Sequence, residues 1–183
     1  MRVAVYGGSF NPPHVGHAMV AAWIRWTGRA DAVWLLPAFR HAFDKALAPW
    51  EARVEMTTAL ADVLGNGARV ERIEEHLPVP SYTVRTLDAL AARHPEHTFH
   101  LVLGADIVPQ LPLWKESERL VARYPLIVVG RQGYAPVDGA PTFPDVSSTE
   151  IRSRIAKGRP VDHLLPRAVA AVMERHGLYR DAP

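Results

Sequence analysis

Residues 7–17, GGSFNPPHVGH, constrain the fold more than any other part of the sequence. They follow a short apolar run at residues 3–6 and precede an alanine-rich amphipathic run at residues 15–26. This order predicts a strand, a tight turn and a helix. Gly7 and Gly8 can adopt backbone angles that are closed to other residues, and they let a ligand approach the main chain closely.

The same stretch contains the signals for the start of the helix. Asn11 is a favourable N-cap, and Pro12 and Pro13 suit a first helical turn, so we expect the helix to begin there. His14 and His17 are three residues apart and would share one face near the positive end of the helix. Helix N-termini attract phosphate, and imidazoles add hydrogen-bond donors. Read separately these residues make an ordinary turn and surface histidines, but together they predict a nucleotide phosphate site.

Composition narrows the class of protein. With 183 residues the chain is expected to form one domain. The sequence lacks cysteine, which excludes disulfides and thiolate zinc sites and makes the cytoplasm the default location. No run approaches the roughly 20 apolar residues of a membrane span. The formal net charge is only +2 and the basic residues are scattered, so we expect no nucleic-acid partner.

Beyond residue 17, strand-like apolar runs alternate with runs at helical spacing. We expect strands at residues 32–37, 69–73, 98–103 and 126–129, and a short edge strand at 142–143. We expect helices at residues 49–64, 82–93, around 114–122, 148–157 and 166–176. The alternation predicts an α/β fold with a doubly wound, mainly parallel sheet and a C-terminal helical segment. Ligands bind such a sheet at the carboxyl ends of its strands.

Two later motifs satisfy this rule. Gly104 and Asp106 follow the expected strand at 98–103, where the Asp106 carboxylate could accept ribose hydroxyls or simply cap a helix. Residues 147–152, SSTEIR, start a helix because Ser147 and Glu150 match the S-x-x-E capping box.

The capping box does not account for the other polar side chains in that turn. Ser148, Thr149 and Arg152 offer two hydroxyls and a planar guanidinium that can bind phosphate bidentately. Gly16, between the two histidines, would leave room for a bulky anion. The sequence therefore predicts two phosphate clamps.

GGSFNPPHVGH resembles the (T/H)xGH signature of the nucleotidyltransferase superfamily, in the form typical of the bacterial nicotinate-nucleotide adenylyltransferase family. GAD at residues 104–106 and SSTEIR also resemble motifs of that family, although Asn11 stands where Asp is usual. The resemblance extends from residue 3 to about residue 180. It implies a Rossmann-like fold and transfer of AMP from ATP to nicotinic acid mononucleotide, which forms deamido-NAD and pyrophosphate.

The resemblance also assigns residues to the two substrates. The residues implied in catalysis, through charge stabilisation and orientation, are His14, His17, Lys45 and Arg152. Those implied in ATP binding are Gly7, Gly8, Ser9, Phe10, His14, Gly16, His17, Gly104, Asp106, Ser147, Ser148, Thr149 and Arg152. Those implied in mononucleotide binding are Lys45, Ser81, Tyr82, Thr83, Asp106 and Trp114.

Some of these assignments compete with simpler interpretations. Trp114 could instead be a core residue. Lys45 lies in a loop at 38–48 that we expect to close over the substrates, although the loop lacks the prolines usual in the family. Arg85 replaces a common Asp in the following helix. Both departures bear on the acceptor rather than on ATP.

The sequence places no nucleophile between the clamps, so we expect direct in-line attack of the mononucleotide phosphate on ATP. Mg²⁺ is expected to arrive with ATP, since no motif has the spacing of a protein-built metal site. A dinucleotide-binding oxidoreductase would need G-x-G-x-x-G, which is missing. Other acceptors (nicotinamide mononucleotide or phosphopantetheine), cytidylyl transfer and a non-catalytic nucleotide sensor stay open, as does a homo-oligomer.

Overall fold

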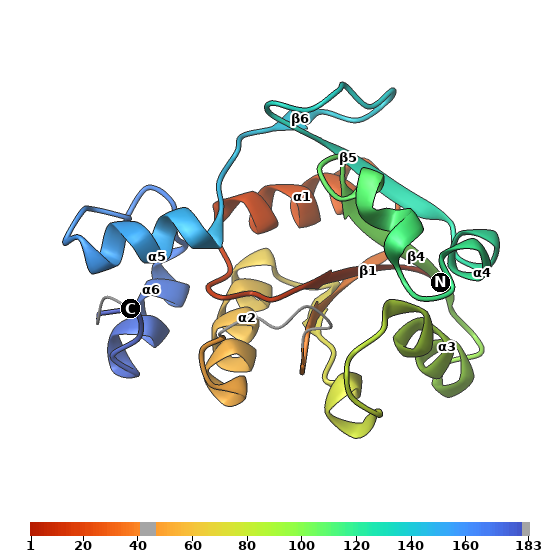
Figure 1. Cartoon of the computed structure of the whole chain (residues 1–183), viewed down its shortest axis with the longest axis horizontal. Helices are drawn as coiled ribbons and strands as arrows, with labels where there is room; N and C mark the ends of the chain where they lie inside the picture. The colour runs from red at the N-terminus through yellow and green to blue at the C-terminus, as the bar shows by residue number, and fades with distance from the viewer. Residues whose placement is uncertain (41–46, 181–183) are drawn as a thin grey trace.

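The computed structural model describes residues 1–40 and 47–180. The strands in this part of the chain are β1 (Arg2–Gly8), β2 (Ala32–Pro37), β3 (Ala68–Val70), β4 (Thr98–Gly104), β5 (Leu126–Arg131) and β6 (Thr142–Phe143). They form one sheet in the order β3-β2-β1-β4-β5-β6, and every neighbouring pair is parallel. The chain crosses from one half of the sheet to the other between β3 and β4, so the topological switch point lies between β1 and β4 (Figure 1).

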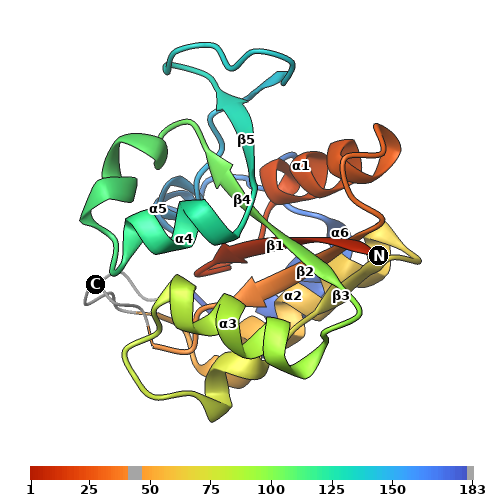
Figure 2. The ribbon, with the colours of Figure 1, turned by 90° about the vertical axis from the view of Figure 1, so that its right-hand side faces the viewer.

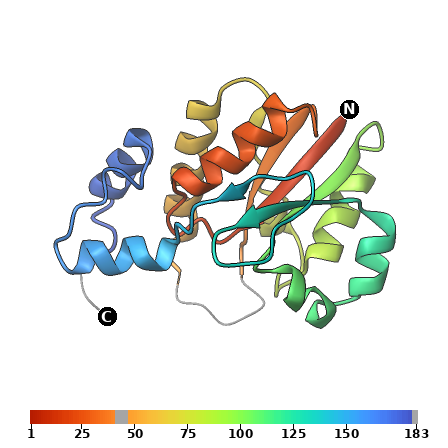
Figure 3. The same ribbon diagram turned by 90° about the horizontal axis from the view of Figure 1, so that it is seen from above.

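Helices cover both faces of this sheet. The α-helices are α1 (Val15–Trp26), α2 (Trp50–Leu64), α3 (Thr83–Arg93), α4 (Ser117–Arg123), α5 (Ser148–Ala156) and α6 (Arg167–Arg175), and two 3₁₀ helices are η1 (Ile73–His76) and η2 (Val108–Leu113). Figure 2 shows α3 and α4 on one side of the strands and α1 on the other. Seen from above, α5 and α6 lie at one end of the molecule (Figure 3). None of the helices within the described ranges is long and apolar enough to cross a membrane.

Two hydrophobic cores follow from alternation along the strands. Ala4 of β1 belongs to the core formed with α1, α2 and α6, and its neighbour Val5 belongs to the core formed with α3 and α4. Both residues are completely or almost completely buried. A strand with two covered faces is typical of a parallel sheet, and it fixes the position of the turn that follows β1.

The predicted elements are present, but the helix expected around 114–122 begins at Ser117 as α4, and the boundaries of two strands also differ. β3 ends at Val70, and residues 73–76 form η1 instead of extending the strand. β5 continues to Arg131 because Gly130 and Arg131 pair with β6. A side chain at position 130 would come within 2.8 Å of the Pro141 carbonyl oxygen, so glycine permits this close pairing.

Candidate active site

Two cavities open at the carboxyl edge of the sheet. The first, of about 560 Å³, lies between β1, β5 and the starts of α1 and α5. The second, of about 540 Å³, lies between β1, β4 and the start of α3. Residues that line both are Tyr6, Ser9, Gly104, Asp106 and Arg131. The cavities therefore meet at the switch point of the sheet, where two ligands would lie end to end.

The turn after β1 differs from its sequence-based prediction. Gly7 and Gly8 are the last residues of β1, paired with Leu36 and Pro37, and the left-handed residue is Phe10, at φ 45°. Both glycines line the second cavity, whereas the resemblance assigned them to ATP. An added Cβ at Gly7 would meet nothing within 4 Å, so the main chain there is open to a ligand.

The start of α1 was also predicted wrongly. The helix begins at Val15 with His14 as its N-cap, so Asn11 is not the N-cap and Pro12 precedes the helix. The Asn11 side-chain oxygen instead accepts hydrogen bonds from the Ala48 amide (3.1 Å) and the Tyr179 hydroxyl (2.7 Å). The Asn11 side-chain oxygen, which the local sequence predicts as the helix cap, thus accepts hydrogen bonds from distant parts of the chain instead.

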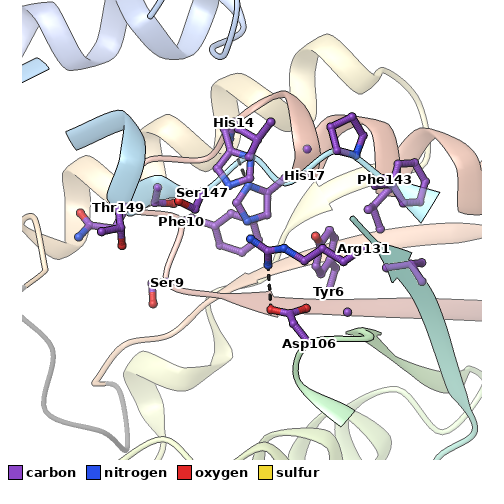
Figure 4. Close-up of a pocket in the computed structure, with 18 of the residues that line it drawn as sticks. Tyr6, Ser9, Phe10, His14, His17, Asp106, Arg131, Phe143, Ser147 and Thr149 are labelled. Atoms are coloured by element: carbon purple, nitrogen blue, oxygen red, sulfur yellow. Dashed lines mark hydrogen bonds and ion pairs between the residues drawn. The ribbon is translucent and has the colours of Figure 1, made fainter. Parts of the chain in front are cut away.

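The two histidines contact each other directly at the helix start. Their ring centroids are 3.8 Å apart, and the His14 amide donates to His17 Nδ1 at 3.1 Å. Because Nδ1 of His17 accepts this bond, the neutral ring carries its proton on Nε2. His14 is only 7% exposed, and both side chains line the first cavity (Figure 4).

Burial keeps this pair neutral. Desolvation, assisted by the positive charge of Arg131, lowers the pKa of His14 from 6.5 to about 4. Desolvation is also the main cause that lowers the pKa of His17 well below 6.5, followed by the charges of His14 and Arg131. A polyphosphate in the first cavity would reverse this balance, since nearby negative charge favours imidazolium.

We expect the stability of the ligand-free protein to fall as pH is lowered from about 6.5 to about 4. In that window the unfolded chain protonates His14, whereas the folded chain, with a pKa of about 4, does not. Stability is therefore complete above pH 6.5, and this group can remove up to about 3 kcal/mol by pH 4. Thermal unfolding at several pH values should show a smaller acid loss for His14→Asn, which retains a capping side chain. Equal losses in both proteins would contradict this.

Gly16 makes room for a side chain as well as for a ligand. A Cβ at this position would lie 3.0 Å from two atoms of the His14 ring. The sequence interpretation explained Gly16 by the space that it leaves for an anion. In the structure, glycine at this position also makes room for the His14 ring. Gly104 is restricted in the same way, because a Cβ there would collide with the Asp106 carboxylate.

Asp106 is held by an arginine that sequence reasoning missed. Arg131 Nη1 lies 2.8 Å from Asp106 Oδ2 (Figure 4). Its Nη2 lies 2.7 Å from Asp145 Oδ1. Asp106 follows β4 and Arg131 ends β5, so their contact joins neighbouring strands at the edge that carries both cavities. The carboxyl-end rule could have found Arg131, but the predicted strand stopped two residues short of it.

The start of α5 is partly occupied by internal hydrogen bonds. Ser147 accepts from the Glu150 amide at 3.1 Å, which confirms the predicted N-cap. Ser148 Oγ donates to the Pro12 carbonyl at 2.8 Å. The Glu150 carboxylate pairs with Arg154 at 2.8 Å, so Glu150 does not act simply as the second half of a capping box.

Arg152 connects this helix to the turn after β1. Its Nη1 donates to the Asn11 carbonyl at 2.7 Å and its Nη2 donates to Thr149 Oγ1 at 3.4 Å. Both Arg152 and Thr149 line the first cavity. Arg152 and His17 are both half-buried, although they lie at helix starts.

The second cavity contains the residues predicted for the mononucleotide. Ser81, Tyr82, Thr83 and Trp114 all line it. Trp114 also packs against the core formed with α3 and α4, so the two interpretations of this residue are compatible. Lys115 Nζ lies 5.0 Å from the Tyr82 ring centroid.

A buried carboxylate at this cavity was not predicted. Glu74 of η1 accepts hydrogen bonds from the Thr86 hydroxyl and the Phe39 amide, both at 2.9 Å. It therefore joins η1 to α3 and to the chain that leaves β2. Lys45 lies outside the described residues.

Comparison with known proteins identifies the family. Residues 5–154 match the model of the family described as cytidylyltransferase-like. A relative from Anaeromyxobacter sp. (strain K), named probable nicotinate-nucleotide adenylyltransferase, is 49% identical over 182 residues, covering 98% of this chain and 97% of its own. The chain belongs to the nicotinate-nucleotide adenylyltransferase family. A relative with the same name from Thermus thermophilus is 41% identical over 187 residues, covering 98% of this chain and all of its own (100%).

A solved structure agrees with this family in its fold. Plasmodium falciparum nicotinic acid mononucleotide adenylyltransferase, complexed with NaAD, superposes with a TM-score of 0.83 and covers 99% of this chain and 98% of its own, at 22% identity. The predicted Rossmann-like architecture is thereby confirmed. Within that architecture the family's motifs lie at the carboxyl edge of the sheet, beside the two cavities.

Proposed function

We propose that this protein transfers AMP from ATP to nicotinic acid mononucleotide, releasing pyrophosphate and forming deamido-NAD. The observation that carries the proposal is the pair of cavities that meet at Asp106 and Arg131, in a chain with relatives named as nicotinate-nucleotide adenylyltransferases. Each cavity has the size for one nucleotide and includes polar side chains in its lining, and the product is the two nucleotides joined.

In this proposal ATP occupies the first cavity. Its phosphates lie between His14 and His17 at the start of α1 and Arg152 at the start of α5, because all three side chains line the same space. Helix N-termini favour anions, and residues from the starts of both α1 and α5 line this cavity. Thr149 and Ser147 add hydroxyls. The Ser148 hydroxyl donates its hydrogen bond to the Pro12 carbonyl, so we assign Ser148 to holding the starts of α1 and α5 together.

Asp106 is the proposed partner of ribose hydroxyls, because it lines both cavities and carboxylates accept hydrogen bonds. Its ion pair with Arg131 holds the carboxylate in one position. Phe10 and Gly16 line the same cavity and complete the ATP site.

The second cavity would hold the mononucleotide. Trp114 offers an aromatic face for the pyridine ring, and Ser81, Tyr82 and Thr83 offer backbone and side-chain polar groups. Lys115 lines this cavity and provides positive charge that suits a pyridine carboxylate better than an amide. Lys45 retains the roles in charge stabilisation and mononucleotide binding that the resemblance implies.

The proposed chemistry needs positioning and charge stabilisation rather than a protein nucleophile. An oxygen of the mononucleotide 5′-phosphate attacks the α-phosphorus of ATP, the new P–O bond forms, and the bond to the β-phosphate oxygen breaks to release pyrophosphate. The attacking phosphate is already ionised, so no general base is needed. Imidazole N–H groups and the Arg152 guanidinium stabilise the charge that develops on the phosphates.

Mg²⁺ belongs to this proposal as part of the ATP substrate. The phosphate clamp consists of imidazole and guanidinium groups, whereas Mg²⁺ prefers oxygen ligands and retains several waters. Asp106, a carboxylate at the junction of the cavities, is already paired with Arg131. The residues therefore fit a metal ion that arrives on the triphosphate.

An acceptor panel tests the function. We expect pyrophosphate release from Mg–ATP with nicotinic acid mononucleotide, with kcat/KM at least about tenfold above that for nicotinamide mononucleotide, since one charge-assisted contact is worth about that factor. Mass spectrometry should identify deamido-NAD as the product. Turnover with phosphopantetheine alone would reassign the acceptor, and binding of ATP without turnover of any acceptor would favour a nucleotide sensor.

A further inference from the structure

A second cluster of titratable side chains lies far from the cavities. His94, Glu96 and His97 belong to the turn that connects α3 to β4, with the sequence HPEH. β4 runs from this turn to Gly104, so the cluster is at the amino end of the strand whose carboxyl end reaches the active site. The seven residues of β4 separate the two ends by roughly 20 Å. Nothing in the proposed reaction uses these side chains.

The backbone brings the three side chains together. The His97 amide donates to the His94 carbonyl at 3.1 Å, which closes a tight four-residue turn. His94 Nδ1 lies 3.6 Å from Glu96 Oε1, and His97 Nε2 lies 3.4 Å from the same oxygen. One potential ligand atom from each residue lies within 4.8 Å of the other two.

Packing fixes the two imidazoles. The rings are stacked at 8°, with their centroids 5.6 Å apart. The buried Trp34 ring packs edge-on against both, at 5.1 Å from His94 and 5.7 Å from His97. The imidazole side chains are 24% and 15% exposed, whereas the Glu96 side chain is 60% exposed. Two imidazole ligands held by packing thus lie beside an exposed carboxylate that can adjust its position to bind an ion.

We propose that His94, Glu96 and His97 bind a divalent transition-metal ion such as Zn²⁺, Ni²⁺ or Cu²⁺. Ligands of a tetrahedral zinc, at about 2.0–2.1 Å from the ion, lie roughly 3.4 Å from one another, close to the two imidazole–carboxylate distances here. Two imidazoles and one carboxylate suit these metals rather than Mg²⁺ or Ca²⁺. Water completes the coordination, since three protein ligands leave a position open.

The site would fasten the end of α3 to the start of β4. An ion that binds only the folded chain stabilises it in proportion to its concentration relative to Kd. It would act on the fold and leave the adenylyl transfer steps unchanged, because the cavities lie at the opposite edge of the sheet. None of the sequence motifs considered above has the residue spacing of a metal site. The folded turn brings these three side chains close enough to bind one ion.

Calorimetric titration of the full chain with ZnCl₂ or NiCl₂ tests the proposal. We expect one equivalent to bind, and a rise in Tm of roughly 8 °C at a metal concentration one hundred times Kd. MgCl₂ at the same concentration should give no such rise. The double variant His94→Gln with His97→Gln should no longer bind the metal. Its turnover should match the wild type in a buffer that contains Mg²⁺ and no transition metal.

Two further variants separate this cluster from other histidines. His76→Gln is the matched control, because His76 Nε2 lies 3.6 Å from the Glu75 carboxylate, an arrangement of one imidazole and one carboxylate. It should bind metal like the wild type, as should His17→Gln, which tests the active-site pair. Glu96→Gln removes an exposed ligand without disturbing the packing on Trp34, and should weaken binding at least about tenfold, the usual effect of disturbing a metal site.

The bound ion also has a spectroscopic signature. Electron paramagnetic resonance of the Cu²⁺-loaded protein should show nitrogen coupling from two imidazoles, and the double variant should lose it. Wild-type affinity in both the double variant and Glu96→Gln would overturn the proposal, as would failure of the wild-type protein to bind any of the three metals. If the double variant does not fold, Glu96→Gln decides the matter alone.

Discussion

The variant His17→Ala is expected to lower kcat for pyrophosphate release by about 10²–10³-fold, the effect of removing one donor that stabilises transition-state charge. His17 lines the first cavity, and its Nδ1 accepts from the His14 amide, which leaves Nε2 for the phosphates in the proposed ATP site. Its ring also packs against Phe10, with centroids 4.8 Å apart, so alanine will cost some stability. Thermal unfolding must therefore accompany the kinetics.

Two isosteric variants separate catalysis from folding at this position. His17→Asn keeps an acceptor near the position of Nδ1, and should retain the bond to the His14 amide while losing turnover as alanine does. His17→Gln places an amide nitrogen near the position of Nε2 and should recover part of kcat. Equal activity for the two variants would mean that the ring acts through packing and not through Nε2.

Arg152→Ala should produce a loss of the same size, about 10²–10³-fold in kcat. The guanidinium lines the first cavity and also donates to the Asn11 carbonyl, so Arg152→Lys keeps the charge but loses the fork and should be intermediate. Arg154→Ala is the matched control two residues along α5, where the guanidinium pairs with Glu150 instead. A loss in Arg154→Ala as large as in Arg152→Ala would assign the effect to the helix rather than to the clamp.

The order of strands and helices could be predicted because hydrophobic periodicity and turn residues are local signals. Ala4 and Val5 face different cores, and a fully buried central strand reads as an uninterrupted apolar run. The Ser147 cap was predictable for the same reason, since the acceptor and the Glu150 amide are three residues apart. The rule that ligands bind at the carboxyl ends of parallel strands then predicted that candidate site residues from distant parts of the sequence lie at one edge of the sheet.

Features that depend on distant partners could not be predicted. Asn11 looks like an N-cap, yet its side chain binds Ala48 and Tyr179, which lie 37 and 168 residues away in the sequence. Arg131 acquires its role from Asp106, which follows the neighbouring strand β4, and from the pairing of β5 with β6. A helix start in isolation also looks exposed, whereas His17 is covered by the aromatic rings of Tyr6 in β1 and Phe10 in the turn that follows it.

Arg53 of α2 is a buried arginine that the sequence did not reveal, and it organises the main chain around the site. It is only 2% exposed, and burial lowers the pKa of its guanidinium. It donates to four backbone carbonyls: Ala48 at 3.1 Å, Ser9 at 3.1 Å, Ala38 at 2.8 Å and Phe39 at 3.4 Å. These belong to the turn after β1, the chain after β2 and the start of α2, so one side chain positions all three segments.

Arg53→Met should lower the free energy of unfolding by about 3 kcal/mol, because four part-buried carbonyls lose their donors while the apolar volume is kept. That corresponds to a fall in Tm of roughly 10 °C in a chain of this size. Ser9 lines both cavities, so KM should rise for ATP and for the mononucleotide together, measured below the new Tm. Arg53→Lys should be intermediate, and Arg167→Met, at the exposed first residue of α6, should match the wild type. If Arg53→Met loses stability but keeps both KM values, the guanidinium supports the fold without positioning Ser9.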